Sequence, residues 1–365
     1  MKVLIIHNDD TREHVRGRKF IAYFLSQGYD YHLYFWRRIT KPDVPDSRAT
    51  VLLNGGGYGT SKLAFFYLIW VVKVFFHFAF KKTFKKEVFF VIDFDSALPI
   101  FFVSLFRRRV TYLYDIHDDF ALRYNWGRFL KSLISSIDRQ IKKRAFRVIH
   151  VDENRVRPEE SNYIIIRNTP SDYILGSLPE KNVSRHTFVS SGLLSAGRGM
   201  MSIARFATCT PNFNFIFAGK VPDNEDYSEL FLLPNCTYLG FIDQESLFKQ
   251  IYGSSGIFSL YDPRLEINKR AASNKLYDAM MLGIPVISNY GLMAEQFIME
   301  NEVGVCVSYE FDESWNILKS DHFLNNIDRI GLKGREVYKR QFSYKENFEV
   351  KLNALFSELS KLDSM

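Results

Sequence analysis

The chain of 365 residues is 47% hydrophobic and 24% charged, and it carries a formal net charge of +7. This composition is that of a folded protein and excludes an intrinsically disordered chain. The length allows two domains that each bury a core of their own. Cys209, Cys236 and Cys306 lack CxxC spacing and are odd in number, which excludes a closed disulfide framework and predicts a reducing compartment.

In the first half of the chain, short apolar runs alternate with helical patterns. The opening run "KVLIIH" is too short for the core of a signal peptide, so the protein is expected in the cytoplasm. A helical pattern follows at 17–28, and further apolar runs lie at 29–36, 50–57, 88–95, 109–117 and 147–154. This alternation predicts a parallel sheet with helices on both faces, a Rossmann-like doubly wound α/β domain over residues 1–175.

One segment of this half, residues 63–80, is almost entirely apolar. As a helix it would be about 27 Å long, nearly enough to cross a bilayer. A crossing would put the strands before and after it on opposite sides of the membrane, and Lys73 would lie near the bilayer centre. Two interpretations remain open: a buried helix that covers the sheet, or a helix whose outer face enters the surface of an anionic membrane. The lysines that follow the segment favour the second interpretation.

After a polar segment near 170–185 that contains prolines, the alternation begins again. Apolar runs at 187–192, 214–219, 236–241, 256–261, 283–288 and 303–308 predict a second domain of the same class over residues 183–342. The C-terminal residues 343–365 have the pattern of an amphipathic helix. Ligands of open α/β sheets bind beyond the carboxyl ends of the strands, so we expect the site in a cleft between two domains that face each other.

The segment "SNKLYDAMMLGIPVIS" predicts a helix that Ser273 or Asn274 caps and Gly283 ends. Lys275 lies in its first turn, where a cation opposes the helix dipole by roughly 0.3–1 kcal/mol. A phosphate bound to the free N–H groups of that turn would make this lysine favourable, and Asp278 on the same side could accept hydroxyl groups. Phosphate and ribose together indicate a nucleotide. The alternative is that Lys275 is solvated and Asp278 only complements the dipole.

Several motifs, in this order along the chain, resemble the GT-B fold glycosyltransferases of family 4, also called group 1 glycosyltransferases. They are "YDIHDDF" and "RNTP", followed by "SGLLSAGRGMMSIARF", "NFIFAGKV", "TYLGFIDQESLFKQI" and "SNKLYDAMMLGIPVIS". The resemblance covers nearly the whole chain. It implies two Rossmann-like domains across a cleft, with the C-terminal helix 343–365 packed back on the first domain. It also implies sugar transfer from a nucleoside-diphosphate sugar with retained anomeric configuration, and with no metal or other cofactor.

The resemblance also implies roles for individual residues. Arg198 and Lys275 match basic positions at the donor diphosphate, where they would neutralise the leaving nucleoside diphosphate. Asp278 matches the acidic position that holds the ribose, and His117 matches the histidine that reaches the transferred sugar. The catalytic set is therefore His117, Arg198 and Lys275. The donor-binding set is Arg198, Ser273, Asn274, Lys275, Asp278 and Gly219.

Three positions depart from the family pattern. Asp278 is one carbon shorter than the glutamate that members usually have at the ribose-binding position. Arg270 stands where members often have an acidic residue, eight positions before Asp278. Leu193 stands where the diphosphate loop commonly has an arginine. Arg198 and Lys275 are therefore expected to balance more of the charge of the diphosphate themselves.

The loops after the first-domain strands supply the acceptor side of the expected cleft. Asn8 and Asp95 are the candidate residues in these loops, and the alternative for Asp95 is packing against the neighbouring loop. Arg16, in the basic stretch "TREHVRGRKF", is the third candidate, and the alternative for it is a solvated helix face. The sequence "DFD" at 93–95 could be an Asp-x-Asp metal motif. The resembling fold instead neutralises its diphosphate with basic residues and a helix dipole, so we expect no metal there.

These observations together predict a specific reaction. The expected activity is transfer of a sugar from a UDP- or GDP-sugar to a lipid-linked oligosaccharide, in polysaccharide or O-antigen assembly at the inner face of the cytoplasmic membrane. Two alternatives are a nucleotide-sugar epimerase of the same fold and a noncatalytic partner subunit that resembles a glycosyltransferase. Nucleic acid is not an expected partner, because the basic residues are scattered among phenylalanines rather than along one polar groove.

Overall fold

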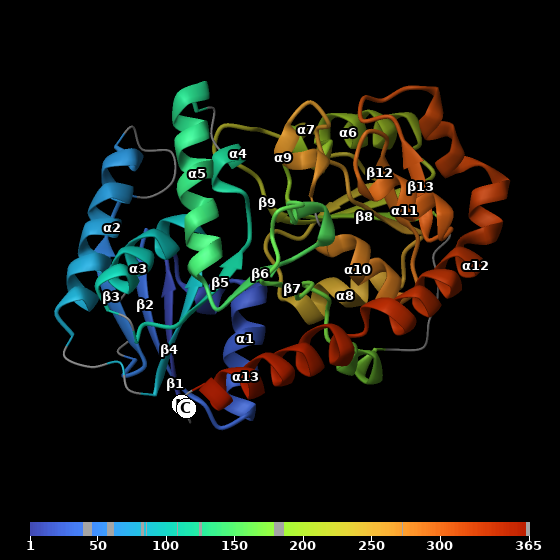
Figure 1. Cartoon of the computed structure of the whole chain (residues 1–365). Coiled ribbons are helices and arrows are strands. Elements are labelled where there is room, and N and C mark those ends of the chain that lie inside the picture. The colour runs from blue at the N-terminus through green and yellow to red at the C-terminus, as the bar shows by residue number, and fades with distance from the viewer. Residues whose placement is uncertain are drawn as a thin grey trace. The chain divides into compact units, whose positions relative to one another are not determined.

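The computed structural model describes residues 1–38, 46–56, 62–81, 84, 86–107, 109–123, 126–178, 186–271 and 273–362. The chain forms two compact units (Figure 1). Unit 1 comprises Met1–Arg167 together with Glu349–Met365, and unit 2 comprises Asn168–Phe348. The predicted first domain ends a little later, at 175, and the predicted start of the second, at 183, lies outside the described residues.

Unit 1 contains a sheet of seven parallel strands in the order β3-β2-β1-β4-β5-β6-β7. The strands are β1 (Lys2–His7), β2 (Asp30–Arg37), β3 (Ala49–Asn54), β4 (Glu87–Ile92), β5 (Tyr112–Ile116), β6 (Arg147–His150) and β7 (Tyr163–Ile165). The strands predicted from the apolar runs are confirmed. Strand β7 was not predicted, because its three residues lie beside prolines and polar residues that indicate a loop.

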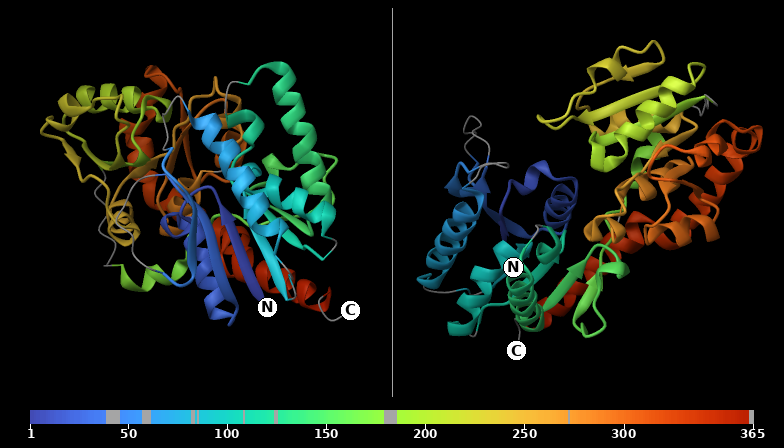
Figure 2. Two further views of the ribbon diagram at one scale, coloured as in Figure 1. Left: turned by 90° about the vertical axis from the view of Figure 1, so that its left-hand side faces the viewer. Right: turned by 90° about the horizontal axis from the view of Figure 1, so that it is seen from above.

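Helices cover both faces of this sheet (Figures 1 and 2). They are α1 (Val15–Ser26), α2 (Leu63–Ala79), α3 (Phe94–Phe106), α4 (Phe120–Arg123), α5 (Arg128–Arg144) and α13 (Lys351–Leu362). Successive strand residues point to opposite faces. Phe89 of β4 therefore shares a core with α2, α3 and α5, while its neighbour Phe90 packs on Phe20 of α1, with ring centroids 4.6 Å apart. Phe356 of α13 packs on Phe24 of α1.

Helix α2 is the apolar segment whose environment the sequence left open. Trp70, Val74 and Phe78 recur every four residues and are buried against the sheet. Phe65 and Phe76 lie on the other side and are exposed. Helix α2 is thus buried along one stripe only. No described helix combines the length and the apolar character needed to cross a bilayer.

Unit 2 contains a sheet of six parallel strands in the order β10-β9-β8-β11-β12-β13. The strands are β8 (Thr187–Leu193), β9 (Asn214–Lys220), β10 (Cys236–Tyr238), β11 (Gly256–Phe258), β12 (Val286–Asn289) and β13 (Gly304–Val307). All six correspond to the predicted apolar runs. The second doubly wound sheet is therefore confirmed.

The helices of unit 2 form a separate core on each face of its sheet. They are α6 (Met200–Cys209), α7 (Ser228–Phe231), α8 (Gln244–Tyr252), α9 (Glu266–Lys269), α10 (Asn274–Leu282), α11 (Ala294–Glu300) and α12 (Asp321–Val337). Phe188 of β8 packs with α6 and α12, whereas the next residue, Val189, packs with α8 and α10. Both faces of a central strand are thus apolar, which is why its sequence reads as a continuous run.

The C-terminal segment is less regular than predicted. Tyr338–Phe342 and Lys345–Val350 form π-helical turns, and the α-helix itself spans only Lys351–Leu362. The predicted helix at 343–365 is therefore too long at its start. Residues 363–365 lie outside the described residues.

Candidate functional site

The predicted site residues fall into two groups, one in each unit. Each group lies where parallel strands end at their carboxyl edge, the usual ligand position of open α/β sheets. In unit 2 the group is built around Arg198 and Lys275, and in unit 1 it is built around His117.

Lys275 lies in the first turn of α10, as predicted, and points to the end of strand β8. A Cβ atom at Gly192, near the end of β8, would lie 3.7 Å from the Lys275 ammonium. Ser273 occupies the N-cap position of α10, but its side chain makes no capping hydrogen bond. Its hydroxyl instead lies 2.6 Å from that of Ser259. The first-turn N–H groups of α10 are thus left uncapped by Ser273, beside a cation, which is the arrangement expected of an anion site.

Arg198 ends a 3-10 turn, η4 (Ala196–Arg198), which follows β8. Its guanidinium lies 3.8 Å from the ring centroid of Tyr261, which follows β11. Its Nη1 is buried and has no hydrogen-bond partner among the described residues. The N–H of Asp262 donates to the carbonyl of Gly197, which fixes the turn against the end of β11. The guanidinium of Arg198 is therefore held over an aromatic ring, with one donor unused.

The strand ends beneath this group approach each other closely. A Cβ at Gly219 of β9 would lie 1.8 Å from the carbonyl oxygen of Gly192, so only glycine fits there.

Asn274 of α10 accepts a hydrogen bond from the side chain of Asn168. Asp278 is half-buried on α10, and its charge contributes to raising the pKa of Tyr338, after the larger effects of burial and of the Asp172 charge. The predicted contact of Asp278 with ribose remains a prediction.

In unit 1 a buried charge network links Arg16, Asp115 and His117. Nη2 of Arg16 donates to Asp115 at 2.6 Å, and Nη1 donates to the carbonyl of Ile166 at 2.7 Å. Nε2 of His117 lies 2.9 Å from the other carboxylate oxygen of Asp115. Burial alone would raise the pKa of Asp115, but the charges of Arg16 and His117 outweigh burial and lower it. Burial alone would lower the pKa of His117, but the charge of Asp115 outweighs burial and raises this pKa.

This network changes the expected role of Arg16. The sequence interpretation had Arg16 reaching into the cleft, whereas its guanidinium is buried and engaged by Asp115 and Ile166. Arg16 is placed to hold Asp115, and through it His117. A direct contact with the acceptor is not part of this arrangement.

Asn8 and Asp95, the other two acceptor-side candidates, are hydrogen-bonded to each other. The side-chain amide of Asn8 donates to Oδ2 of Asp95, while Oδ1 of Asp95 is buried without a hydrogen-bond partner among the described residues. Burial, followed by the charge of Asp93, raises the pKa of Asp95 to about 6. A buried carboxyl group that titrates near neutral pH is typical of a functional site.

The raised pKa of Asp95 predicts a specific pH dependence of stability. Between its ordinary pKa and about 6, the folded protein binds more protons at this group than the unfolded chain, so the contribution of Asp95 to stability falls as the pH rises. Asp95→Asn should remove this fall. We expect the variant to gain about 2 kcal/mol relative to the wild type between pH 4 and pH 7.5. Urea unfolding at both pH values measures this gain, and an unchanged difference between the two proteins would contradict it.

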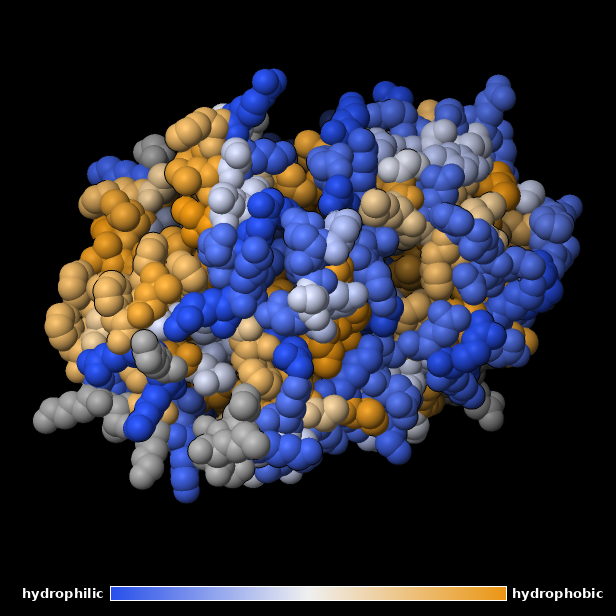
Figure 3. All heavy atoms as spheres, in the orientation of Figure 1, coloured by the Kyte–Doolittle hydropathy of each residue, from blue (hydrophilic) through white to orange (hydrophobic). Residues whose placement is uncertain are grey.

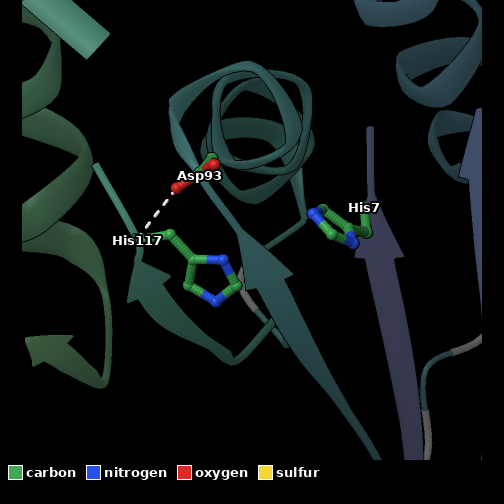
Figure 4. Close-up of side chains that lie close together, drawn as sticks. All are labelled: His7, Asp93 and His117. Atoms are coloured by element: carbon green, nitrogen blue, oxygen red, sulfur yellow. Dashed lines mark hydrogen bonds between the residues drawn. The ribbon is translucent and has the colours of Figure 1, made fainter. Parts of the chain in front are cut away.

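His117 also meets His7 and Asp93 where β1, β4 and β5 end (Figure 4). Their potential ligand atoms lie within 4.8 Å of one another. Asp93 has a φ of 62°, a conformation that is strained for a residue other than glycine. Its Oδ1 accepts hydrogen bonds from the backbone N–H groups of His117 at 2.9 Å and Asp118 at 3.4 Å. Strained Asp93 thus fixes the loop that carries His117.

The charges around this cluster do not favour a metal ion. Arg123 lies 3.8 Å from the second oxygen of Asp93, and its charge already faces that carboxylate. Burial, the two neighbouring histidines and the charges of Arg38 and Arg123 lower the pKa of His7 well below its ordinary value. A cation in this cluster would be repelled by the same arginines. The described contacts of the cluster are hydrogen bonds and ion pairs within the protein.

The sequence interpretation missed His7 and Asp115 as site residues. His7 is the last residue of β1 and Asp115 the penultimate residue of β5, and both strands are otherwise buried and nearly all apolar. A polar residue near the carboxyl end of an apolar strand was the available signal. That signal does not predict which of these polar residues lie next to each other in the folded protein.

Comparisons with known proteins support the fold. The sequence matches no protein-family model, and no curated protein matches it. The solved structure of Anabaena Alr3699/HepE in complex with UDP-glucose is similar, with a TM-score of 0.66 and 14% identity over 98% of this chain and 100% of that chain. AviGT4, a glycosyltransferase involved in avilamycin A biosynthesis, is similar with a TM-score of 0.55 and 10% identity, covering 97% and 96%.

The fold is not restricted to one activity. UDP-GlcNAc 2-epimerase from Methanocaldococcus jannaschii is also similar, with a TM-score of 0.53 and 12% identity over 93% of this chain and 99% of that chain. At these identities the likeness establishes the fold alone. The chain has two parallel α/β domains of the GT-B type, which confirms the predicted fold class.

Proposed function

We propose that the protein is a glycosyltransferase that moves a sugar from a nucleoside-diphosphate sugar to a saccharide acceptor. One observation carries this proposal: the Lys275 ammonium lies beside Gly192 at the uncapped start of α10, on the carboxyl edge of the unit 2 sheet. Arg198, held on Tyr261, supplies a second cation on the same edge. The likeness to a structure in complex with UDP-glucose is consistent with a nucleotide sugar as the ligand.

The chemistry that follows is electrostatic. As the bond from the sugar to the diphosphate breaks, negative charge grows on the leaving phosphate, and fixed cations with backbone N–H groups stabilise that charge. Lys275 would contribute a point charge, and the unused Nη1 of Arg198 a directed hydrogen bond. We propose that no metal is required for this step. Asn274 and Ser273 would flank the diphosphate, Asp278 would bind the ribose, and Gly219 would allow the strand ends to close beneath it.

Unit 1 would supply the acceptor side. The imidazole of His117, held by Asp115, would contact the transferred sugar, with Asn8 and Asp95 at the acceptor hydroxyl groups. We further propose retention of anomeric configuration, with the leaving phosphate itself taking the proton of the acceptor hydroxyl group. The product's anomeric configuration, measured by NMR, decides between retention and inversion.

The acceptor is proposed to be carried on a lipid, and the enzyme to act peripherally at the inner face of the cytoplasmic membrane during cell-surface polysaccharide assembly of the O-antigen type. The apolar outer side of α2 supports this part of the proposal.

The first experiment is a thermal-unfolding screen of the full chain against UDP- and GDP-sugars. A ligand present at 100 times its Kd should stabilise the protein by about 2.7 kcal/mol. Stabilisation by one nucleotide class would identify the base. No stabilisation by any nucleotide sugar would favour the noncatalytic partner subunit instead.

The need for an acceptor distinguishes a transferase from the alternative, an epimerase. An epimerase converts the nucleotide sugar without an acceptor, whereas a transferase releases the nucleoside diphosphate only when the acceptor is present or water replaces it. Incubating the stabilising donor alone and analysing the sugar by NMR therefore distinguishes them. Epimerised nucleotide sugar in that sample would overturn the transferase proposal.

A further inference from the structure

Six exposed phenylalanines gather on one side of unit 1. They are Phe65, Phe76, Phe80, Phe102, Phe106 and Phe129, which belong to α2, the end of α3 and the start of α5 or directly follow them. Among the described residues only seven phenylalanines are exposed, and the seventh, Phe241, is in unit 2. Figure 3 shows hydrophobic residues gathered over the side of the molecule that Figure 1 labels α2 and α3. We call these six residues the phenylalanine face.

Contacts between the helices make this face continuous at one end. The guanidinium of Arg107, directly after α3, donates to the carbonyl of Ala79 at the end of α2. Phe106 and Phe80 are the chain neighbours of these two residues, and they are the two most exposed members on these helices, at 77% and 75%. The ring of Phe80 stacks on that of Phe76, with centroids 6.0 Å apart. The ends of α2 and α3 thus present one aromatic patch to solvent.

The exposed charges of the helix segments that carry the phenylalanine face have one sign. Helix α2 contains no acidic residue, the only acidic residue of α3 is the buried Asp95, and α5 has none before Asp138. The exposed cations beside the face include Lys62, Arg109, Arg128 and Lys131. The apolar side chains match the hydrocarbon part of a lipid surface. The cationic rim, with no exposed acid on these helices, matches anionic headgroups.

We infer that unit 1 docks on an anionic bilayer through the phenylalanine face, with the axis of α2 along the membrane plane. The buried stripe of Trp70, Val74 and Phe78 holds α2 on the sheet, so the outward phenylalanines can enter the interface without loss of the core. A second copy of the chain fits this face less well, because a two-fold contact would bring its lysines and arginines against their own counterparts. The inference rests on the membrane part of the proposed function and deepens it by naming the docking surface and the lipid charge, while docking itself requires no donor and no turnover.

Flotation of the full-length protein with vesicles tests this inference. Equal parts of phosphatidylcholine and phosphatidylglycerol should bind the protein, and phosphatidylcholine alone should bind it much more weakly. The triple variant Phe76→Ser, Phe80→Ser, Phe106→Ser should lose at least about tenfold in binding to the anionic vesicles, because three rings no longer enter the interface. Phe241→Ser, which changes a phenylalanine that is 89% exposed in unit 2, is the matched control and should bind like the wild type.

A second variant tests the charges separately. Arg128→Gln with Lys131→Gln should weaken binding to the anionic vesicles by about fivefold for each charge, and should leave the weak binding to phosphatidylcholine unchanged. All substituted side chains are exposed, so circular dichroism and thermal unfolding should match the wild type. If the triple variant fails to fold, Phe106→Ser alone takes its place.

Three outcomes would overturn the inference. They are full binding by the triple variant, equal binding of the wild type to neutral and anionic vesicles, and a change from dimer to monomer in the triple variant by sedimentation without vesicles. The last outcome would assign the face to a second copy. Failure of donor binding in the thermal screen would overturn the proposed sugar transfer and leave vesicle binding unaffected, so sugar transfer and membrane docking fail separately.

Discussion

Lys275→Ala is expected to lower kcat/KM for the nucleotide sugar by about 100- to 1000-fold, the cost of removing one donor that stabilises charge in a transition state. The reason is the position of its ammonium beside Gly192, at the first turn of α10, where the leaving phosphate is proposed to bind. Binding of the donor should also weaken, by about tenfold or more, because a charge-assisted hydrogen bond is lost. Steady-state kinetics and calorimetry measure the two effects. The fold should be unaffected, since Lys275 is only half-buried.

A matched lysine in the same unit provides the control. Lys249 is exposed on α8 and paired with Glu245 at 2.9 Å. Lys249→Ala removes the same charge from unit 2 without touching the proposed site, and its donor affinity should equal that of the wild type. Equal affinities for Lys275→Ala and Lys249→Ala would show that the diphosphate is not bound at α10.

Asp115→Ala is expected to destabilise the protein by about 3–5 kcal/mol. Both partners of the Arg16–Asp115 pair are buried, with 5% and 0% of their side chains exposed. Without Asp115 the guanidinium of Arg16 would stay buried with an uncompensated charge. Urea unfolding near pH 6 measures the loss. A change below about 1 kcal/mol would show that the pair is not buried in solution.

Two further variants separate the pair from a general packing defect. The double variant Arg16→Ala, Asp115→Ala should be less destabilised than the sum of the two single variants, because it leaves no buried charge unpaired. Glu245→Ala, which breaks the exposed pair with Lys249, should change stability by no more than about 0.5 kcal/mol.

The loss at Asp115 should depend on pH in a defined way. The lowered pKa of Asp115 contributes stability above its ordinary pKa, and this contribution is lost as the pH falls through the lowered value. The raised pKa of His117 contributes stability below its ordinary pKa, and this contribution is lost as the pH rises through the raised value. Asp115→Ala should therefore cost most between the ordinary pKa values of the two groups.

The motif around Lys275 shows how far sequence reasoning reached in unit 2. A lysine in a first helical turn is locally unfavourable, and the helix α10 was predicted with its Gly283 end, which has a φ of 67° in the structure. The side-chain cap was not predicted correctly, because the Ser273 hydroxyl bonds Ser259 of another segment. Local propensity places a capping residue, but a tertiary partner decides where its hydroxyl points.

The hydrogen-bond network of Arg16 in unit 1 shows what sequence reasoning could not predict. Arg16 and Asp115 are 99 residues apart, and no local pattern pairs them. The sequence interpretation placed Arg16 on the acceptor side of the expected cleft because it lies in a basic stretch. The parallel order of β1, β4 and β5 decides instead that α1 lies against Asp115 and Ile166.

The sequence by itself determined the two doubly wound sheets, since strands buried on both faces must be continuously apolar and helices must carry a periodic stripe. It also determined the unfavourable position of Lys275, which depends only on the helix dipole. Tertiary structure alone decided which polar strand ends meet, which side of α2 is buried and which buried cation is neutralised within the fold. Those outcomes depend on contacts between distant segments, whose energies no local pattern records.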